Sequence, residues 1–167
     1  MSKYNWKTKP YEHQTTALEN SCFSEYYALY MEMGTGKSKV IVDTMALLFE
    51  AGHIDTVLIL APKGVYDNWI RSEIPRHLPD RIPHNLVRWQ NNLTKKFVAD
   101  MQGIIYPGKR KADTLHTLVM NIEAVSTKKG ASTVLKYLKS NPKNLLVVDE
   151  STTIKNHKAL RTKNIIK

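Results

Sequence analysis

A short run of residues near the N-terminus has the composition of a phosphate-binding loop. The run Met31-Glu32-Met33-Gly34-Thr35-Gly36-Lys37-Ser38 follows a β-rich segment and precedes an amphipathic one, which is the context that such a loop requires. Gly34 and Gly36 allow the backbone to curl until its N–H groups converge on phosphate oxygens. Lys37 offers an ammonium group to the phosphates and Ser38 a hydroxyl to Mg²⁺, while the next helix adds the positive end of its dipole. The run begins with methionine, where the strict motif has glycine.

A pair of acidic residues supplies the partner that a phosphate loop needs. Asp149 and Glu150 directly follow the apolar run Leu145–Val148. Two adjacent acids are poor core residues, but they are natural at the ligand end of a parallel sheet. Asp149 is expected to hold Mg²⁺ through its water shell, and Glu150 to orient and deprotonate the attacking water. On its own the pair also fits a surface turn; downstream of a phosphate loop, the catalytic interpretation is favoured.

The elements that must position these residues read as alternating strands and helices. Thr56–Ala61 and Leu145–Asp149 contain continuous rather than alternating apolar runs, which is typical of strands covered on both faces. The pattern therefore predicts an α/β domain with a mainly parallel sheet. The remaining expected strands are Tyr26–Met31, Asn85–Trp89 and Leu118–Ile122; helices are expected at about 40–48, 65–74 (ending near Pro75), 132–140 and 157–166, and residues 90–117 read as a loop-rich excursion.

Composition narrows the class of partner. The 167 residues carry 25 Lys and Arg against 15 Asp and Glu, a net charge of +10. Residues 1–94 are balanced, so the whole excess belongs to residues 95–167. Such asymmetry suggests a polyanionic partner, most often nucleic acid, although a solvated lysine-rich surface gives the same count.

Other classes are excluded by simple counts. The single cysteine, Cys22, permits no disulfide framework and is expected to be a small buried hydrophobe. No apolar run approaches the roughly 20 residues of a membrane span, and the first residues lack the apolar core of a secretory signal. The six histidines show no metal-ligand spacing. A cytoplasmic or nucleoid-associated location is therefore expected, rather than a secreted one.

Taken together, the motifs resemble the first RecA-like domain of superfamily-two helicases, most closely the Swi/Snf-type DNA translocases. The resemblance covers about residues 8–167 and implies a RecA-like P-loop fold, in which a mainly parallel sheet is flanked by helices. Within Val148–Asn156, which resembles motif II of the family, Ser151-Thr152 replace the usual Ala-His. Four segments carry the resemblance: Lys9–Gln14, Met33–Ser38, Leu58–Lys63 with Asn68-Trp69, and Val148–Asn156.

The resemblance also implies a ligand set and residue roles. ATP and Mg²⁺ are the expected cofactors, and Gln14 would recognise the adenine base. Lys37, Asp149 and Glu150 would be catalytic, and the metal would lie between Ser38 and Asp149. The expected nucleotide-binding residues are Gln14, Met33, Gly34, Thr35, Gly36, Lys37 and Ser38.

Nucleic acid is the partner that the resemblance implies. Pro62, Lys63 and Asn121 would contact it, and DNA is favoured over RNA by the Swi/Snf-like Asn68-Trp69 and Lys155-Asn156. Trp69 itself is expected to be a packing anchor rather than a base-stacking residue. Two further basic runs, Lys109-Arg110-Lys111 and Lys128-Lys129, are expected to be exposed, and contact with DNA or with solvent alone both remain open.

The family pattern also predicts that something is missing. Hydrolysis in these enzymes needs arginines from a second RecA-like domain, whose contribution is typically about 10³–10⁵ in rate. Residues 1–167 are interpreted as one RecA-like domain, incomplete at its C-terminus: the strand carrying motif III, which lies between the phosphate-loop strand and the Asp149 strand, has no counterpart in the sequence. The chain alone is therefore expected to hydrolyse ATP poorly.

Three functions fit these features. The first is an ATP-binding motor domain that couples hydrolysis to movement on nucleic acid. The second is the motor subunit of a restriction system, which uses the same motifs. The third is a regulatory module that retains nucleotide binding without turnover.

Overall fold

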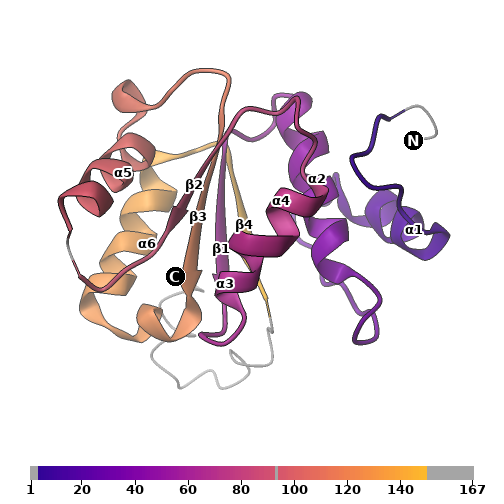
Figure 1. Ribbon diagram of the computed structural model, residues 1–167, viewed down its shortest axis with the longest axis horizontal. Helices are drawn as coiled ribbons and strands as arrows, with labels where there is room; N and C mark the ends of the chain where they lie inside the picture. The colour runs from indigo at the N-terminus through magenta and orange to yellow at the C-terminus, as the bar shows by residue number, and fades with distance from the viewer. Residues whose placement is uncertain (1–3, 93, 150–167) are drawn as a thin grey trace.

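The computed structural model describes residues 4–92 and 94–149 of the chain (Figure 1). Four strands alternate with helices, as the sequence pattern predicts. The strands are β1 (Thr56–Ala61), β2 (His84–Arg88), β3 (Leu115–Asn121) and β4 (Asn144–Val148). The helices are α1 (Glu12–Ser21), α2 (Lys37–Glu50), α3 (Tyr66–Asn68), α4 (Ile74–His77), α5 (Lys95–Ile105) and α6 (Lys128–Ser140).

The strands form one parallel sheet in the order β2-β3-β1-β4, which confirms the predicted α/β class. Ala61 at the end of β1 lies beside Asn121 at the end of β3, and Leu60 lies beside Val148 at the end of β4. All carboxyl ends therefore meet at one edge of the sheet, which we call the carboxyl edge, and all strand starts meet at the opposite edge, the amino edge.

Helices cover both faces of this sheet (Figure 1). Every residue of β1 is buried, and its side chains alternate between two cores. Val57, Ile59 and Ala61 pack with α2 and α4, whereas Leu58 and Leu60 pack with α5 and α6. This two-sided burial is what a continuous apolar run in a central parallel strand predicts. Within the described residues, no helix is long and apolar enough to cross a membrane.

The expected strand Tyr26–Met31 is wrong. These residues form no strand in the structure, and Tyr26 and Tyr30 are 86% and 96% exposed. A β-rich segment becomes a strand only where a neighbouring strand pairs with it, because its backbone groups need partners. β4 pairs with β1 on one side, and in the described part of the chain no strand lies along its other side.

The loop-rich reading of residues 90–117 is also wrong. α5 occupies Lys95–Ile105, and β3 begins at Leu115, three residues before the expected start. Thr94 caps the helix, because its side chain accepts a hydrogen bond from the Phe97 N–H at 3.1 Å. The apolar face at Phe97, Met101, Ile104 and Ile105 packs into the core. This periodicity was visible in the sequence, but the Gly and Pro residues nearby obscured it.

The expected helix over 65–74 is interrupted by a π-helical turn at Trp69–Glu73, and it continues past Pro75 to His77. The Ile74 N–H donates to the Trp69 carbonyl, five residues back. Pro75 has no N–H to donate, so a wider turn just before it leaves fewer backbone groups without partners. The turn also sets the position of Trp69. The expected helix over 157–166 lies outside the described residues.

Candidate nucleotide-binding site

The phosphate loop has the backbone conformation that its glycines predict. Gly34 and Gly36 have φ angles of 79° and 84°, in the left-handed region that side chains disfavour. Gly36 is the N-cap of α2, which begins at Lys37. The loop therefore presents backbone N–H groups and the positive end of a helix dipole at the same place. The helix begins beside the carboxyl edge, where the strands end (Figure 1).

The side chain of Lys37 lies inside this loop. Its Nζ donates to the carbonyls of Met31 and Glu32, each at 2.9 Å. The Thr35 hydroxyl donates to the same Glu32 carbonyl at 2.7 Å, while Met33 points outward and is 91% exposed. An ammonium held by neutral carbonyls exchanges readily to phosphate oxygens, because the negative charge of the phosphate adds a Coulombic attraction that a carbonyl lacks.

Gln14 contacts the loop directly. Its Nε2 donates to the Thr35 carbonyl at 3.0 Å, and its Oε1 accepts from the Tyr11 N–H at 3.0 Å. The His13 ring also lies 3.0 Å from the Thr35 carbonyl. With 4% of its surface exposed, Gln14 sits behind the loop and supports Gly36, whose added Cβ would lie 2.3 Å from Gln14 Nε2. Its expected contact with adenine stays a prediction.

Asp149 follows β4 at the carboxyl edge, as the sequence predicts. Its backbone N–H donates to the Leu60 carbonyl at 2.8 Å. Its Oδ2 accepts a hydrogen bond from the indole Nε1 of Trp69 at 2.8 Å. Trp69 is fully buried in the core, so it is the packing anchor that was expected. The contact with Asp149 gives this anchor a second role that sequence reasoning missed. Glu150 lies outside the described residues.

Two residues in the first turns of α2 form a buried ion pair that the sequence analysis also missed. Lys39 Nζ lies 2.5 Å from Asp43 Oδ2, with both side chains buried. Burial raises the pKa of Asp43 to about 6, and the hydrogen bond from Lys39 opposes that shift. The Trp6 ring lies 5.7 Å from the Lys39 ammonium. Residues around Trp6 are thereby held against α2, and they lead directly into the segment that carries Gln14. Charged residues at i and i+4 of a helix usually form a solvent-exposed pair, so the spacing of Lys39 and Asp43 did not indicate that they hold this segment.

The same N-terminal segment is held at a second point by a neutral histidine. The Thr8 hydroxyl lies 2.6 Å from His77 Nδ1. Burial, followed by the nearby positive charge of Lys39, lowers the pKa of His77 to about 4. The segment before α1 is thus docked on both α2 and α4.

The three residues expected to contact nucleic acid are brought together. Pro62 and Lys63 follow β1, and Asn121 ends the neighbouring β3. Glu123 links the two turns, since it accepts from the Lys63 N–H at 3.3 Å and lies 3.5 Å from the Asn121 amide. These residues share the carboxyl edge with Asp149. Their contact with nucleic acid stays a prediction.

The residues present fit a nucleotide with a divalent metal. Two left-handed glycines open the loop at a helix N-terminus, Lys37 is held by exchangeable carbonyls, and Asp149 stands at the carboxyl edge. Among the described residues, no group of three His, Cys, Asp or Glu side chains forms a metal site by itself. The metal would therefore need oxygens from a bound phosphate as well, as Mg²⁺ does in nucleotide sites.

A parallel α/β sheet with such a loop and a strand-ending aspartate defines a P-loop nucleotide-binding domain. The family model for the res subunit of type III restriction enzymes, ResIII, matches residues 7–167. The chain belongs to this family and is an N-terminal ATPase domain of helicase superfamily two, an ATP-binding, helicase-like motor module. Domains of this kind use ATP with a divalent metal and work on nucleic acid together with a partner domain. No match was found among curated proteins.

The Trp69–Asp149 hydrogen bond can be tested by Trp69→Phe, which removes the donor and keeps most of the packing. Losing a hydrogen-bond partner of a metal-holding side chain typically costs about 10–100-fold in metal affinity or activity. We expect at least a tenfold higher Mg²⁺ concentration for half-maximal binding of a fluorescent ATP analogue.

Trp89→Phe is the matched control. Trp89 is also buried, but its indole Nε1 has no hydrogen-bond partner within the described structure. This variant should leave the Mg²⁺ dependence within about twofold of the wild type, because no hydrogen bond is lost. Equal Mg²⁺ dependence in Trp69→Phe and the wild type would show that Trp69 is only a packing residue.

Proposed function

We propose that this chain is the ATP-binding motor domain of a DNA helicase or translocase, coupling hydrolysis to movement on DNA through a second RecA-like domain. The observation that carries the proposal is the assembly of the phosphate loop, Asp149 and the Pro62–Lys63 turn around one edge of one parallel sheet. Ligands of open α/β sheets bind at this edge. Nucleotide and nucleic acid would thus contact neighbouring turns of the same sheet.

The residues divide the work of hydrolysis. The loop N–H groups and Lys37 would bind and orient the phosphates, and Ser38 and Asp149 would hold the metal ion. Bound Mg²⁺ would supply charge neutralisation at the transferring phosphoryl group. Trp69 fixes the orientation of the Asp149 carboxylate. Glu150 accepts the proton of the attacking water, and Gln14 adds recognition of adenine to its support of the loop.

The sheet supports the proposal that a further strand completes this domain. β4 is an edge strand in the described sheet, and its residues are less buried than those of β1 and β3. The Tyr26–Met31 segment carries strand-forming residues but pairs with no strand. One strand inserted between β4 and the Tyr26–Met31 segment would pair with both, and it would cover exposed tyrosine rings. That insertion is the place of the motif III strand in the family pattern.

The Swi/Snf branch is the form of motor that we propose. Asn68 and Trp69 begin the turn that reaches Asp149, so the Asn-Trp pair of that branch has a structural role in this chain. Lys155-Asn156, its second marker, lies outside the described residues. DNA is the proposed substrate on the same grounds.

A restriction-system motor is the second candidate, and the family match is consistent with it as well. Such a motor uses the same motifs. The two candidates share every step at the nucleotide, so the site does not separate them. A nuclease or methylase activity associated with the chain would identify the restriction system.

The test is a pair of variants assayed for binding and for turnover. Lys37→Ala should lose nucleotide binding under every candidate function. Glu150→Gln keeps the shape of the side chain but removes the general base, so ATP-analogue affinity should change less than about twofold. Single-turnover hydrolysis should fall at least a hundredfold, in line with general-base contributions of about 10²–10⁴.

Two outcomes would contradict the proposal. Unchanged single-turnover hydrolysis in Glu150→Gln would exclude the motor function and favour a regulatory module that only binds the nucleotide. Robust DNA-stimulated steady-state turnover by the wild-type chain alone would refute the need for a second domain.

A further inference from the structure

Five basic residues of the described chain lie around the amino edge, opposite the nucleotide site. The loop between α5 and β3 carries Lys109, Arg110 and Lys111. Lys136 lies near the end of α6 and Lys143 directly before β4. We call these five residues the basic edge. In Figure 1 the α5–β3 loop arches over the end of the sheet where the strands begin.

The acids near the basic edge do not cancel its charge. Asp55 is paired with Arg110, whose Nη1 lies 3.2 Å from Asp55 Oδ1. Glu50 is engaged by Arg81, which lies outside the set, through two hydrogen bonds at 2.7 and 3.1 Å. Asp113 is the remaining carboxylate that lines the adjoining cavity. The five cations therefore keep a clear positive excess.

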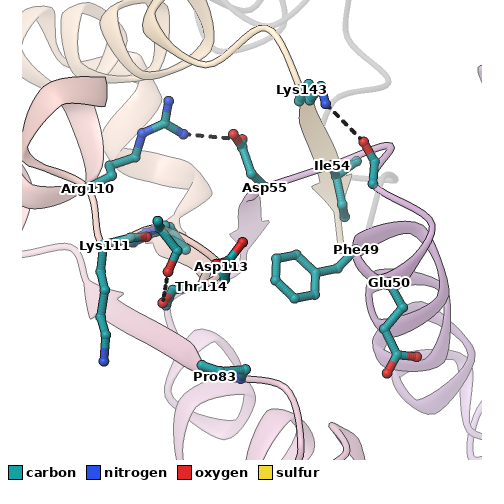
Figure 2. Close-up of a pocket in the computed structure, with 13 residues that line it drawn as sticks. Phe49, Glu50, Ile54, Asp55, Pro83, Arg110, Lys111, Asp113, Thr114 and Lys143 are labelled. Atoms are coloured by element: carbon teal, nitrogen blue, oxygen red, sulfur yellow. Dashed lines mark hydrogen bonds and ion pairs between the residues drawn. The ribbon is translucent and has the colours of Figure 1, made fainter.

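Two adjoining cavities form a groove in this edge. The larger has a volume of about 680 Å³ and the smaller about 430 Å³. They share Pro83, Lys111, Thr114 and His116, so they adjoin at the start of β3. The smaller cavity is lined by Lys109 and Lys111 and by no acidic residue. Figure 2 shows the larger one, with Arg110 and Lys143 on either side of Asp55. The groove is large enough for a phosphate and its sugar.

Arg110 stands in this groove with unused donor capacity. Its side chain is 12% exposed, and its Nε is buried without a hydrogen-bond partner in the described structure. A guanidinium offers five N–H donors in a planar fork that matches phosphate oxygens. The protein covers Nε, so an anion in the groove would contact the exposed part of the guanidinium rather than this atom.

The loop that carries these cations is held in shape before any ligand arrives. The Lys111 carbonyl lies 3.1 Å from His116 Nε2, and the Leu115 N–H donates to the Pro83 carbonyl at 2.8 Å. Asp113 adopts a φ of 50°, a left-handed conformation that is uncommon outside glycine. A fixed loop loses little entropy on binding, which favours a functional groove.

An aromatic ring lies beside the basic edge. Tyr106 is 43% exposed, and the Lys136 ammonium lies 4.8 Å from its ring centroid while donating to its hydroxyl at 2.7 Å. An exposed ring flanked by cations is the combination with which proteins bind single strands: charges follow the backbone and a base stacks on the ring.

We propose that the basic edge binds the phosphate backbone of single-stranded nucleic acid, at a site separate from the Pro62–Lys63 turn. The groove receives the backbone, Lys109 and Lys111 contact successive phosphates, and Tyr106 receives a base. The site faces away from the nucleotide, so a strand held here keeps the motor associated with its track whatever the state of ATP. An acidic protein or a single free anion would meet the same charges without using the ring.

The experiment measures binding of labelled oligothymidylate to the full chain, without ATP, by fluorescence anisotropy at several salt concentrations. Lys109→Gln/Lys111→Gln should weaken binding at least tenfold. It should also lower the slope of log affinity against log salt by about 1.4, since each single-strand phosphate contact contributes about 0.7. Tyr106→Ala should weaken binding at least about fivefold through lost stacking.

The control is Lys95→Gln/Lys96→Gln at the other end of α5, which makes the same change of charge on exposed residues. It should stay within about twofold of the wild type, and all variants should keep the wild-type thermal melt. Lys37→Ala, which should lose ATP binding, should bind the oligothymidylate as the wild type does. This result would separate the basic edge from the nucleotide site. Equal losses in both lysine pairs would show general charge attraction and overturn the proposal.

Two competitors distinguish other ligands. Polyglutamate that displaces the oligonucleotide, with the same loss in Lys109→Gln/Lys111→Gln, would assign the edge to an acidic protein and overturn the proposal. Inorganic phosphate is the second competitor. If it displaced the oligonucleotide better than chloride at equal ionic strength, the edge would be a pocket for one free anion, which would also overturn the proposal.

Discussion

Replacing Gly36 with alanine is expected to weaken ATP binding by roughly 30- to 100-fold. Gly36 has a φ of 84°, where a side chain costs about 1–2 kcal/mol. The new Cβ would also lie 2.3 Å from Gln14 Nε2, so Gln14 must give up its hydrogen bond to the Thr35 carbonyl. That bond contributes about 1 kcal/mol. The free loop would relax away from the phosphate-binding conformation to avoid both costs, so binding must restore that conformation, and the sum of the two costs corresponds to the expected loss of affinity. Titration with a fluorescent ATP analogue measures it.

Gly52→Ala is the matched control for this experiment. Gly52 also has a positive φ, 73°, and follows the end of the same helix, but an added Cβ meets nothing within 4 Å. The variant should lose about 1 kcal/mol of stability and none of its ATP affinity. If Gly36→Ala bound the nucleotide as well as Gly52→Ala does, the support of the loop by Gln14 would be refuted.

Gly130→Ala is expected to have the largest effect on stability. Gly130 lies in the first turn of α6, and an added Cβ would stand 2.0 Å from the Ala124 carbonyl oxygen and 2.6 Å from its carbon. These atoms belong to the backbone of the turn after β3, so no rotamer change relieves the clash. Overpacking of this kind costs about 1–3 kcal/mol, sometimes more. We expect about 3 kcal/mol, which corresponds to a melting temperature lower by roughly 6–12 °C.

Gly103→Ala, in the last turn of α5, gives the opposite expectation. Gly103 lies within α5, and an added Cβ meets nothing within 4 Å. Alanine is the better helix former, so the variant should be more stable by about 0.5–1 kcal/mol. Thermal melts of both variants, followed by circular dichroism, test the packing of α6 on the turn after β3. Similar melts for the two would contradict that packing.

The parts of the fold that were predictable share one property: their sequence pattern reflects burial that the described chain provides. β1 is the example, because five consecutive apolar residues after Thr56 occupy a strand buried on both faces. The phosphate loop is another, since its glycine spacing reflects a local backbone requirement and needs no distant partner.

The failures come from partners that local patterns do not specify. Tyr26–Met31 has the residues of a strand, yet a strand exists only beside another strand. α5 was missed although its apolar spacing is helical, because turn residues on its C-terminal side dominated the reading. Tertiary structure decides whether a strand-forming segment finds a partner strand. It also decides whether helical spacing or nearby turn residues prevail.

The site shows the same division. The loop residues and Asp149 were identified from their motifs, and the structure places them at one helix start and one strand end. The Trp69–Asp149 bond joins residues 80 positions apart and depends on a π-helical turn, which no motif predicts. The buried Lys39–Asp43 pair was hidden because its spacing is that of an ordinary exposed helix pair.

The central claim is that Gly34–Ser38 and Asp149 form an ATP site, and equilibrium titration of a fluorescent ATP analogue tests it most directly. The wild-type chain should bind saturably with Mg²⁺ and much more weakly with excess chelator. Lys37→Ala removes charge-assisted bonds that contribute about 3 kcal/mol, so its affinity should fall about 100-fold. Equal binding by the wild type and Lys37→Ala, or no dependence on Mg²⁺, would contradict the account.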